Sequence, residues 1–323
     1  MKKQFALLFL AGLLGFSAKA QDPHFTQFYA NPLYLNPAFA GSSKCPRVNL
    51  NYRNQYPNLA ADFVTYSISY DQHIDALHGG IGLMVMTDQA GQGALGITEA
   101  SAIYSYQLAV NRSFSILMGF QGTYRQRSLD WSKLNFPDQI DEMYGFVRPT
   151  GETPPGEPTV STIDLSAGIV GFSEFFYAGA AVHHITEPEE AFLEEGVLPM
   201  RLTAHTGAVI PFGGTGRVGD KQFISPNVLY YKQQDFEQLN LGLSVQRNEL
   251  AGGFWFRQNF QNADAVMLIL GYQPDNFRIG YSYDFTISKL SNTTGGAHEI
   301  SFAYTFECRP KKKKFKTINC PSF

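Results

Sequence analysis

Two segments near the C-terminal end alternate large apolar residues with small or charged residues, and this pattern constrains the fold more than any other feature. They are FRIGYSYDFTI at residues 277–287 and HEISFAYTF at residues 298–306. Successive side chains of a β-strand point to opposite faces, so each segment predicts a strand with one apolar and one polar face. Such strands belong either to a half-buried sheet of a soluble protein or to a barrel in a membrane.

The first residues have the features of an export signal. Two lysines precede an apolar run at residues 5–16, and the sequence AKA follows at residues 18–20. We predict a signal peptide at residues 1–20, cleaved after Ala20. The run is shorter than the roughly 20 apolar residues of a spanning helix. No longer apolar run follows it, so insertion into a membrane would require a closed β-barrel.

Composition favours the membrane alternative. Charged residues make up 16% of the chain and aromatic residues 14%, whereas about 25% charged residues is usual in soluble domains. A net charge of −3 argues against a nucleic-acid partner.

Alternating segments bounded by turn residues recur along the whole chain and predict about fourteen strands. They lie near residues 47–54, 61–72, 79–88, 96–110, 113–128, 161–171, 174–185, 200–211, 222–232, 236–247, 249–259, 264–273, 275–287 and 297–307. Charged residues avoid the apolar faces, as lipid contact requires, because a charge at mid-membrane depth costs about 2–4 kcal/mol. An even number of such strands is typical of a single bacterial outer-membrane barrel.

The polar faces of these strands would line the lumen of the barrel. The charged residues that we place there, where they would line a pore or hold a plug, are Arg125, Arg127, Arg278, Asp284 and Glu299. Side chains alone fill the interior of a barrel of only about eight strands, so a wider barrel needs a plug or a ligand.

The plug candidate is the segment that precedes the first strand, at residues 21–45. Two Asn-Pro turns interrupt it, and it would be costly to leave its apolar residues in water. Its aromatic residues are Phe25, Phe28, Tyr29, Tyr34 and Phe39. We expect this segment inside the barrel, and the alternative is an exposed tail.

The connections are consistent with a barrel whose N-terminus is periplasmic, because short turns then alternate with longer outer loops. The longest insertion, residues 130–159, falls on the outer side, and loops of that length are usually functional or disordered. A second outer loop, residues 186–198, is acidic, and we interpret its glutamates as solvated surface charge. Two inner connections, residues 71–78 and 211–221, are longer than the expected turns.

No motif indicates catalysis. The chain has no G-x-S-x-G, H-E-x-x-H, P-loop or CxxC sequence. The histidines and acids at residues 71–78 and 183–187 lack the spacing of a metal site. We therefore predict no catalytic residue, metal or cofactor, although a hydrolytic triad is recognised by geometry rather than by sequence order.

Three cysteines are too few for a disulfide framework. Cys308 and Cys320 are close enough in the sequence to pair, which would leave Cys45 unpaired, and free thiols are the alternative. Residues 308–323 form a basic tail on the expected periplasmic side. This tail is either solvated or in contact with an acidic partner such as a periplasmic subunit.

Three stretches of the sequence resemble a known family. They are DPHFTQFYANPLYLNPAFAGS, YSYDFTISKLSNTTGGAHEISFAYTF and the closing CPSF, and they resemble the PorP/SprF family of outer-membrane proteins associated with type IX secretion and gliding motility. The resemblance spans nearly the whole mature chain. It implies a barrel that interacts with other proteins, either secreted adhesins or subunits of the secretion machine.

We therefore expect an all-β protein with a single transmembrane antiparallel barrel at residues 46–307, of about fourteen strands and FadL-like in size, in the bacterial outer membrane. We expect it to be non-enzymatic and to bind an adhesin or machine subunits for cargo secretion or surface attachment. The alternatives are a transporter or porin for a hydrophobic or small solute, and a soluble secreted β-sandwich or propeller.

Overall fold

The computed structural model describes residues 22–308, apart from residues 60–61, 112, 142, 155, 191, 193–195, 213–221, 261 and 288–294. The expected signal peptide and nearly all of the basic tail lie outside the described residues. In the described part of the chain, no helix has the length and apolar character needed to cross a membrane.

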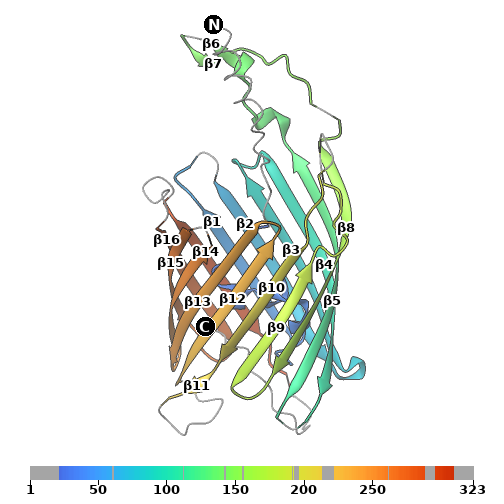
Figure 1. The fold of residues 1–323 in the computed structure, drawn as a ribbon, viewed down its shortest axis with the longest axis vertical. Helices are drawn as coiled ribbons and strands as arrows, with labels where there is room; N and C mark the ends of the chain where they lie inside the picture. The colour runs from blue at the N-terminus through green and yellow to red at the C-terminus, as the bar shows by residue number, and fades with distance from the viewer. Residues whose placement is uncertain are drawn as a thin grey trace, which may run out of the picture.

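In the described residues, fourteen long antiparallel strands form one closed barrel (Figure 1). They are β1 (Arg47–Gln55), β2 (Phe63–Ile74), β3 (Gly79–Ala90), β4 (Leu95–Ala109), β5 (Ser115–Leu129), β8 (Thr159–Phe172), β9 (Phe176–His183), β10 (Arg201–Ala208), β12 (Gln222–Gln233), β13 (Phe236–Arg247), β14 (Leu250–Asn259), β15 (Asn262–Tyr272), β16 (Phe277–Thr286) and β17 (Ala297–Thr305). β1 pairs with β17, which closes the barrel. A short extra strand, β11 (Ile210–Pro211), pairs with β12. The predicted barrel is confirmed, and each predicted strand overlaps an observed one.

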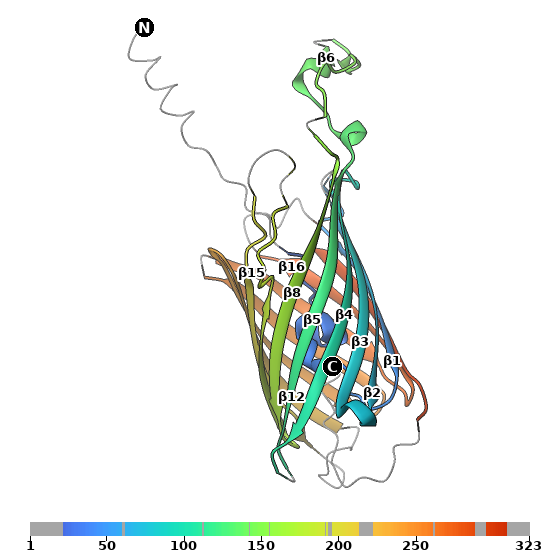
Figure 2. The same cartoon turned by 90° about the vertical axis from the view of Figure 1, so that its right-hand side faces the viewer.

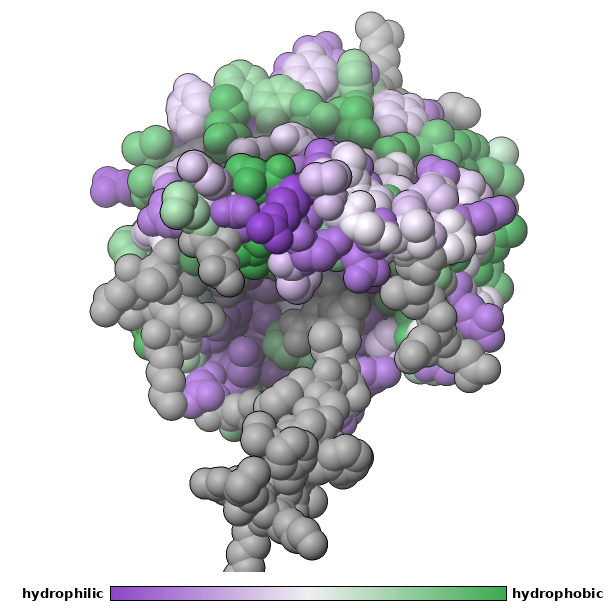
Figure 3. Space-filling view, turned by 90° about the horizontal axis from the view of Figure 1, so that it is seen from above, coloured by the Kyte–Doolittle hydropathy of each residue, from purple (hydrophilic) through white to green (hydrophobic). Residues whose placement is uncertain are grey.

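The two faces of the strands meet different environments, as the alternation predicts. Large apolar side chains such as Leu83, Phe120 and Leu270 are 60–68% exposed on the outer surface, whereas polar residues such as Asn49 and Ser282 are buried inside. Figure 3 shows the hollowed mouth of the barrel with hydrophilic residues inside it and apolar residues around the wall. The outer surface is therefore suited to lipid and the interior to polar contacts.

The two rims of the barrel differ. One rim carries short turns such as those between β4 and β5 and between β13 and β14. The opposite rim carries the connection from β5 to β8, which stands well above the barrel and contains the small hairpin of β6 (Ile140–Asp141) and β7 (Gly145–Phe146) (Figures 1 and 2). Because short turns face the periplasm in outer-membrane barrels, we call these the inner and outer rims.

Two expectations about the inner rim are corrected. β2 continues to Ile74, and the turn η3 (Asp75–Leu77) leads directly to β3, so this connection is short. Cys308 bonds to Cys45, with Cα atoms 5.5 Å apart, so the pairing of Cys308 with Cys320 is wrong. Cys45 precedes β1 and Cys308 follows β17, and these neighbouring strands bring the two cysteines together across 263 residues of sequence.

Residues 22–41, here called the lumen segment, lie inside the barrel (Figures 1 and 2). They form three short turns: η1 (Phe28–Ala30), α2 (Pro32–Leu35) and η2 (Pro37–Phe39). A proline begins each of the last two turns, where its missing N–H has no partner to lose. The Asn36 side chain accepts a hydrogen bond from the N–H of Ala38 at 2.9 Å. The sequence of the segment therefore favours a compact, turn-rich conformation.

The apolar core lies between the lumen segment and the barrel wall. Phe28 meets the ring of Trp255 edge to face, with the ring centres 4.9 Å apart. On another side of the segment, Leu33 belongs to a cluster with Met84 and Met86 of β3. These contacts remove the apolar side chains of the segment from water, which favours its place inside the barrel.

Candidate functional site

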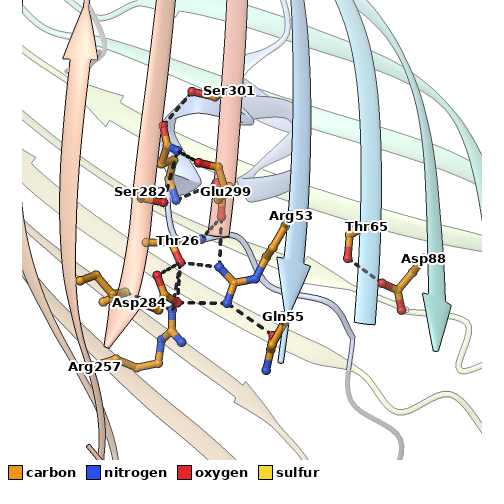
Figure 4. A network of polar contacts seen from close by, with 12 residues as sticks. Thr26, Arg53, Gln55, Thr65, Asp88, Arg257, Ser282, Asp284, Glu299 and Ser301 are labelled. Atoms are coloured by element: carbon orange, nitrogen blue, oxygen red, sulfur yellow. Dashed lines mark hydrogen bonds and ion pairs between the residues drawn. The ribbon is translucent and has the colours of Figure 1, made fainter. Parts of the chain in front are cut away.

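A first polar anchor holds the lumen segment through Thr26 (Figure 4). The Thr26 hydroxyl donates to the carboxylate of Asp284, with oxygen distances of 2.7 and 2.8 Å. The same hydroxyl oxygen accepts from Arg53 at 2.5 Å and from Arg257 at 3.2 Å. The backbone N–H of Thr26 donates to Glu299 at 2.7 Å. One small side chain thus touches charged groups from β1, β14 and β16, and its backbone touches β17.

The charges of this anchor are paired with one another. Arg53 lies 3.0 Å from Asp284 and 3.2 Å from Glu299, and Arg257 lies 2.9 Å from Asp284. The side chains of these residues are 1–4% exposed. A buried charge is tolerated when it is paired and hydrogen-bonded, and removing one partner costs about 3–5 kcal/mol. The first anchor is therefore a balanced set of two cations and two anions around the segment.

A second anchor holds Asp22, near the outer rim. Its carboxylate lies 2.6 Å from His184 Nε2 and 3.2 Å from Arg201. The other ring nitrogen of His184 lies 2.9 Å from Asp164 of β8. Arg201 also donates to the Tyr34 hydroxyl at 2.6 Å. Arg201, at the start of β10, thus holds Asp22 and Tyr34 of the lumen segment, and His184, just after β9, also holds Asp22.

The electrostatics of the second anchor favour its charged form. Burial alone would lower the pKa of His184, but Asp22 and Asp164 outweigh burial and raise this pKa to about 9. Burial would likewise raise the pKa of Asp22, yet His184 and Arg201 hold it well below its usual value. Near neutral pH, both groups are charged and attract each other.

The connection between β9 and β10 folds into the outer mouth of the barrel. Glu190 lies 2.5 Å from Arg125 Nε, and Arg125 also pairs with Glu99. The backbone oxygen of Glu190 accepts from Arg127 at 3.0 Å, and Phe192 lies under the Arg127 guanidinium at 5.1 Å. The interpretation of this acidic loop as solvated charge is wrong for Glu190, which is 5% exposed because lumen arginines draw it inward.

The barrel wall has glycines where Asn36 and Ala38 of the lumen segment lie against it. A Cβ atom on Gly119 of β5 would lie 2.2 Å from the Ala38 nitrogen, and one on Gly168 of β8 would lie 2.0 Å from the Asn36 side chain. The amide of Asn36 donates to the backbone oxygens of Ile169 and Ala180 at 3.2 and 3.1 Å. Side chains at these glycine positions would exclude the segment from its observed place.

The structure places the residues selected from the sequence as follows. The five aromatic residues of the lumen segment are all buried. Asp284 and Glu299 belong to the first anchor, and Arg125 pairs with Asp22 at 3.8 Å. Arg127 holds the inward loop, and Arg278 is buried in the inner half of the lumen. The structure thus brings Asp284, Glu299 and Arg125 to the lumen segment, and Arg127 to the loop that covers it.

Several anchor residues were missed by sequence reasoning. Arg53 and Arg257 stand at polar positions of alternating strands, so the same face-sorting argument would have found them. Arg201 begins β10 on the same polar face as Thr203 and His205, so that argument would have found it as well. Asp22 and His184 have no such signal, because both lie outside the strands. In the described residues, no group of three or more His, Cys, Asp or Glu side chains is placed to hold a metal ion.

The space left beside the second anchor is small. A cavity bounded by Asp22, Tyr34, Glu99 and Arg201, among others, has a volume of about 10 Å³. That volume is close to the minimum for a single water molecule.

Comparison with known proteins establishes the family. The family model described as type IX secretion system membrane protein PorP/SprF matches residues 17–304. The chain belongs to the PorP/SprF family. The resemblance noted in the sequence is confirmed, and the family indicates an outer-membrane protein of type IX secretion.

A solved structure shares the fold of this PorP/SprF protein. The toluene transporter TbuX of Ralstonia pickettii is 12% identical, with a TM-score of 0.52 over 85% of this chain and 93% of that chain. The toluene transporter TodX of P. putida is 12% identical, with a TM-score of 0.49 over 85% of this chain and 93% of that chain. At this identity the likeness to TbuX shows the fold alone. No curated protein sequence matches the chain.

Proposed function

We propose that this PorP/SprF barrel is a non-enzymatic scaffold that binds a secreted adhesin or subunits of the type IX machine, for cargo secretion or surface attachment. The observation that carries the proposal is that residues 22–41 lie buried inside the barrel, where two buried polar anchors tie them to the wall. Because its interior is occupied in this way, the barrel offers its rims to other proteins rather than a channel to a solute.

The energetics of the anchors argue against easy passage of a solute. Opening the lumen would separate the Thr26 backbone from Glu299 and Asp22 from His184, both of which are buried contacts. Separating one buried charge from its partner costs about 3–5 kcal/mol. The lumen segment thus acts as a fixed plug in this proposal, not as a gate.

The insertion above the outer rim supports binding of a large extracellular partner. Met143, Tyr144, Phe146 and Val147 around the β6–β7 hairpin are 59–80% exposed. Asp141 holds this tip in shape, because it accepts from the N–H of Met143 at 2.9 Å and pairs with Arg148 at 2.8 Å. Clustered apolar side chains on an ordered, water-exposed element favour contact with another protein.

The inner side offers a second set of contacts in this proposal. Residues 309–316 include four consecutive lysines and two further basic residues. They follow the Cys45–Cys308 disulfide at the inner rim, so the tail starts from a fixed point. An acidic periplasmic subunit is the partner that this charge would attract.

Deletion of the gene in the native cell tests the proposal. We expect large secreted proteins that remain on the wild-type surface to be lost from it, as measured by surface biotinylation and mass spectrometry. Re-expression of the full chain should restore them. If the same proteins are secreted and retained in equal amounts without the barrel, the proposed function is wrong.

A further inference from the structure

Among the described residues, the outer end of β8 has a neighbouring strand on one side only. β8 pairs with β5 along its whole length, from Thr159 to Phe172. Its pairing with β9 starts only at Ala167, opposite Val182. Figure 2 shows β5 and β8 rising toward the insertion, and β4 reaches the same level, because Leu95 pairs with Leu129. The wall therefore has a step at this point, and the outer part of β8 is an open sheet edge.

The free backbone groups on this edge can be assigned. The N–H of Leu129 in β5 donates to the oxygen of Pro158, whereas the N–H of Ile185, on the other side, donates to the oxygen of Leu165. Alternate residues of an antiparallel strand turn their N–H and C=O to opposite neighbours. Ser161 and Ile163 therefore face the open side. Among the described residues, their contact there is a long one of 3.4 Å, from the Thr186 hydroxyl to the oxygen of Ile163.

Exposure along the strand agrees with a missing neighbour. Ile163 is 72% exposed, whereas Leu165 and Ile169 on the same face are 49% and 47% exposed. The sequence TVSTIDLS at residues 159–166 contains no proline and no lysine. These are the residues with which proteins usually block open edges.

The position of the edge makes it accessible from outside the cell. Along the outward face of β8, apolar residues end at Ile163, and Ser161 and Thr159 follow. On β5, Tyr124 ends the apolar band, and its hydroxyl donates to Ser161 at 3.0 Å. A tyrosine at the end of an apolar band is typical of the membrane interface. The edge thus lies at the interface and above it.

We propose that the edge from Thr159 to Ile163 accepts an extended strand of the secreted partner, an inference that rests on the proposed function. Backbone pairing with Ser161 and Ile163 would supply the contact, as in β-augmentation. In the connection after β9, Thr186 contacts Ile163 of the edge, and the nearby Glu187 and Glu189 are exposed. The partner strand is therefore flanked by basic residues.

Substitution of Ser161 by proline tests the edge. Proline removes the N–H on the open side and leaves the N–H groups that bond to β5 in place. The matched control is Ser161→Ala, which changes the same side chain and keeps the N–H. In a deletion strain that expresses each variant, we expect Ser161→Pro to retain about tenfold less of the barrel-dependent surface protein than Ser161→Ala, because strand pairing is lost.

A second variant distinguishes the loss of strand pairing from a folding defect. Ile163→Lys keeps the backbone and places on the open edge a residue that opposes strand addition. Heat-modifiable gel migration shows which variants contain a folded barrel. We expect Ile163→Lys to lower surface retention as Ser161→Pro does, while both variants migrate as folded barrels.

The outcomes separate this inference from the proposed function. If deletion of the whole gene leaves surface proteins unchanged, both ideas are wrong. If deletion removes them but Ser161→Pro and Ile163→Lys retain them as Ser161→Ala does, the edge is not the docking site and the scaffold function stands. A purified dimer that Ser161→Pro converts to monomer would assign the edge to a second copy of this chain, and so overturn the inference.

Discussion

Thr26 shows how much a single side chain can contribute inside this barrel. Its hydroxyl meets Asp284, Arg53 and Arg257, and each of these charged groups comes from a different strand. A hydroxyl can donate once and accept twice, which matches the three partners. At the residue scale, the anchors therefore depend on groups with the correct number of donors and acceptors rather than on charge alone.

Replacing Thr26 by valine removes the hydroxyl and keeps the shape of the side chain. We expect the free energy of unfolding of the barrel to fall by about 1–3 kcal/mol, because buried polar partners lose a hydrogen bond. Denaturant unfolding in detergent measures the change. Thr26→Ser keeps the hydroxyl and should remain close to wild type. Equal losses for valine and serine would contradict a role for the hydroxyl.

His184 makes the second anchor sensitive to pH. Because its pKa is raised to about 9, its contribution to stability is fully present below its unfolded value of about 6.5 and is lost as pH rises through 9. The pKa of Asp22 is lowered instead, so its contribution is present above about 3.9 and is lost only in stronger acid. The anchor should be strongest between about pH 3.9 and pH 6.5, where both contributions are fully present.

Thermal unfolding at a series of pH values checks this expectation. From pH 7 to pH 10, the wild-type barrel should lose roughly 1–3 kcal/mol more stability than His184→Gln, which has no charge to lose. Other groups that titrate in this range affect both proteins alike. Parallel curves for the two proteins would show that the pair of His184 and Asp22 does not hold the segment.

At the scale of elements, the lumen segment and the wall fit each other through backbone contact. η2 packs against β5 and β8, where Gly119 and Gly168 leave room for it. Asn36 then bonds to backbone oxygens of the wall. The segment is thus held by shape at one end and by ion pairs at the other.

Two glycines of β5 provide a matched test of this fit. A Cβ atom on Gly119 would lie 2.2 Å from Ala38, whereas a Cβ atom on Gly122 would have no other atom within 4 Å. We expect Gly119→Ala to speed hydrogen exchange of the amides at residues 36–40 by displacing η2, and Gly122→Ala to leave exchange unchanged. Equal exchange in both variants would mean that the wall tolerates a side chain at Gly119.

At the scale of the whole molecule, the barrel is closed and holds residues 22–41 inside it, which is the basis of the proposed scaffold function. The disulfide between Cys45 and Cys308 ties the ends of the first and last strands at the inner rim. The long insertion, the inward loop and the open edge of β8 all lie at the outer rim. The disulfide thus joins the two ends of the barrel sequence on the inner side.

Electrical recording tests the filled lumen directly. We expect the purified wild-type barrel to show little conductance in a planar bilayer, and a variant that lacks residues 24–41 to show a much larger one. This deletion keeps Cys45 and all fourteen long strands of the described chain. A large wild-type conductance that the deletion does not change would favour the transporter or porin alternative.

The strands were predictable because their signal is local. Each face of segments such as 115–129 and 236–247 meets one environment along its whole length, so alternation alone separates outside from lumen. Arg53 and Arg257 carry the same signal. The inward position of Glu190 could not be predicted, because it depends on Arg125, whose strand lies far from Glu190 in the sequence.

By itself, the sequence predicted an exported barrel of about fourteen strands, because period-2 alternation acts over short stretches of chain, and three of its stretches resembled the PorP/SprF family. Only the tertiary structure decided which cysteines pair, which charges hold the lumen segment, and where β8 lacks a neighbour. These features depend on strand register and on the closure of β1 against β17. Both bring distant residues together, and no local sequence pattern indicates these contacts.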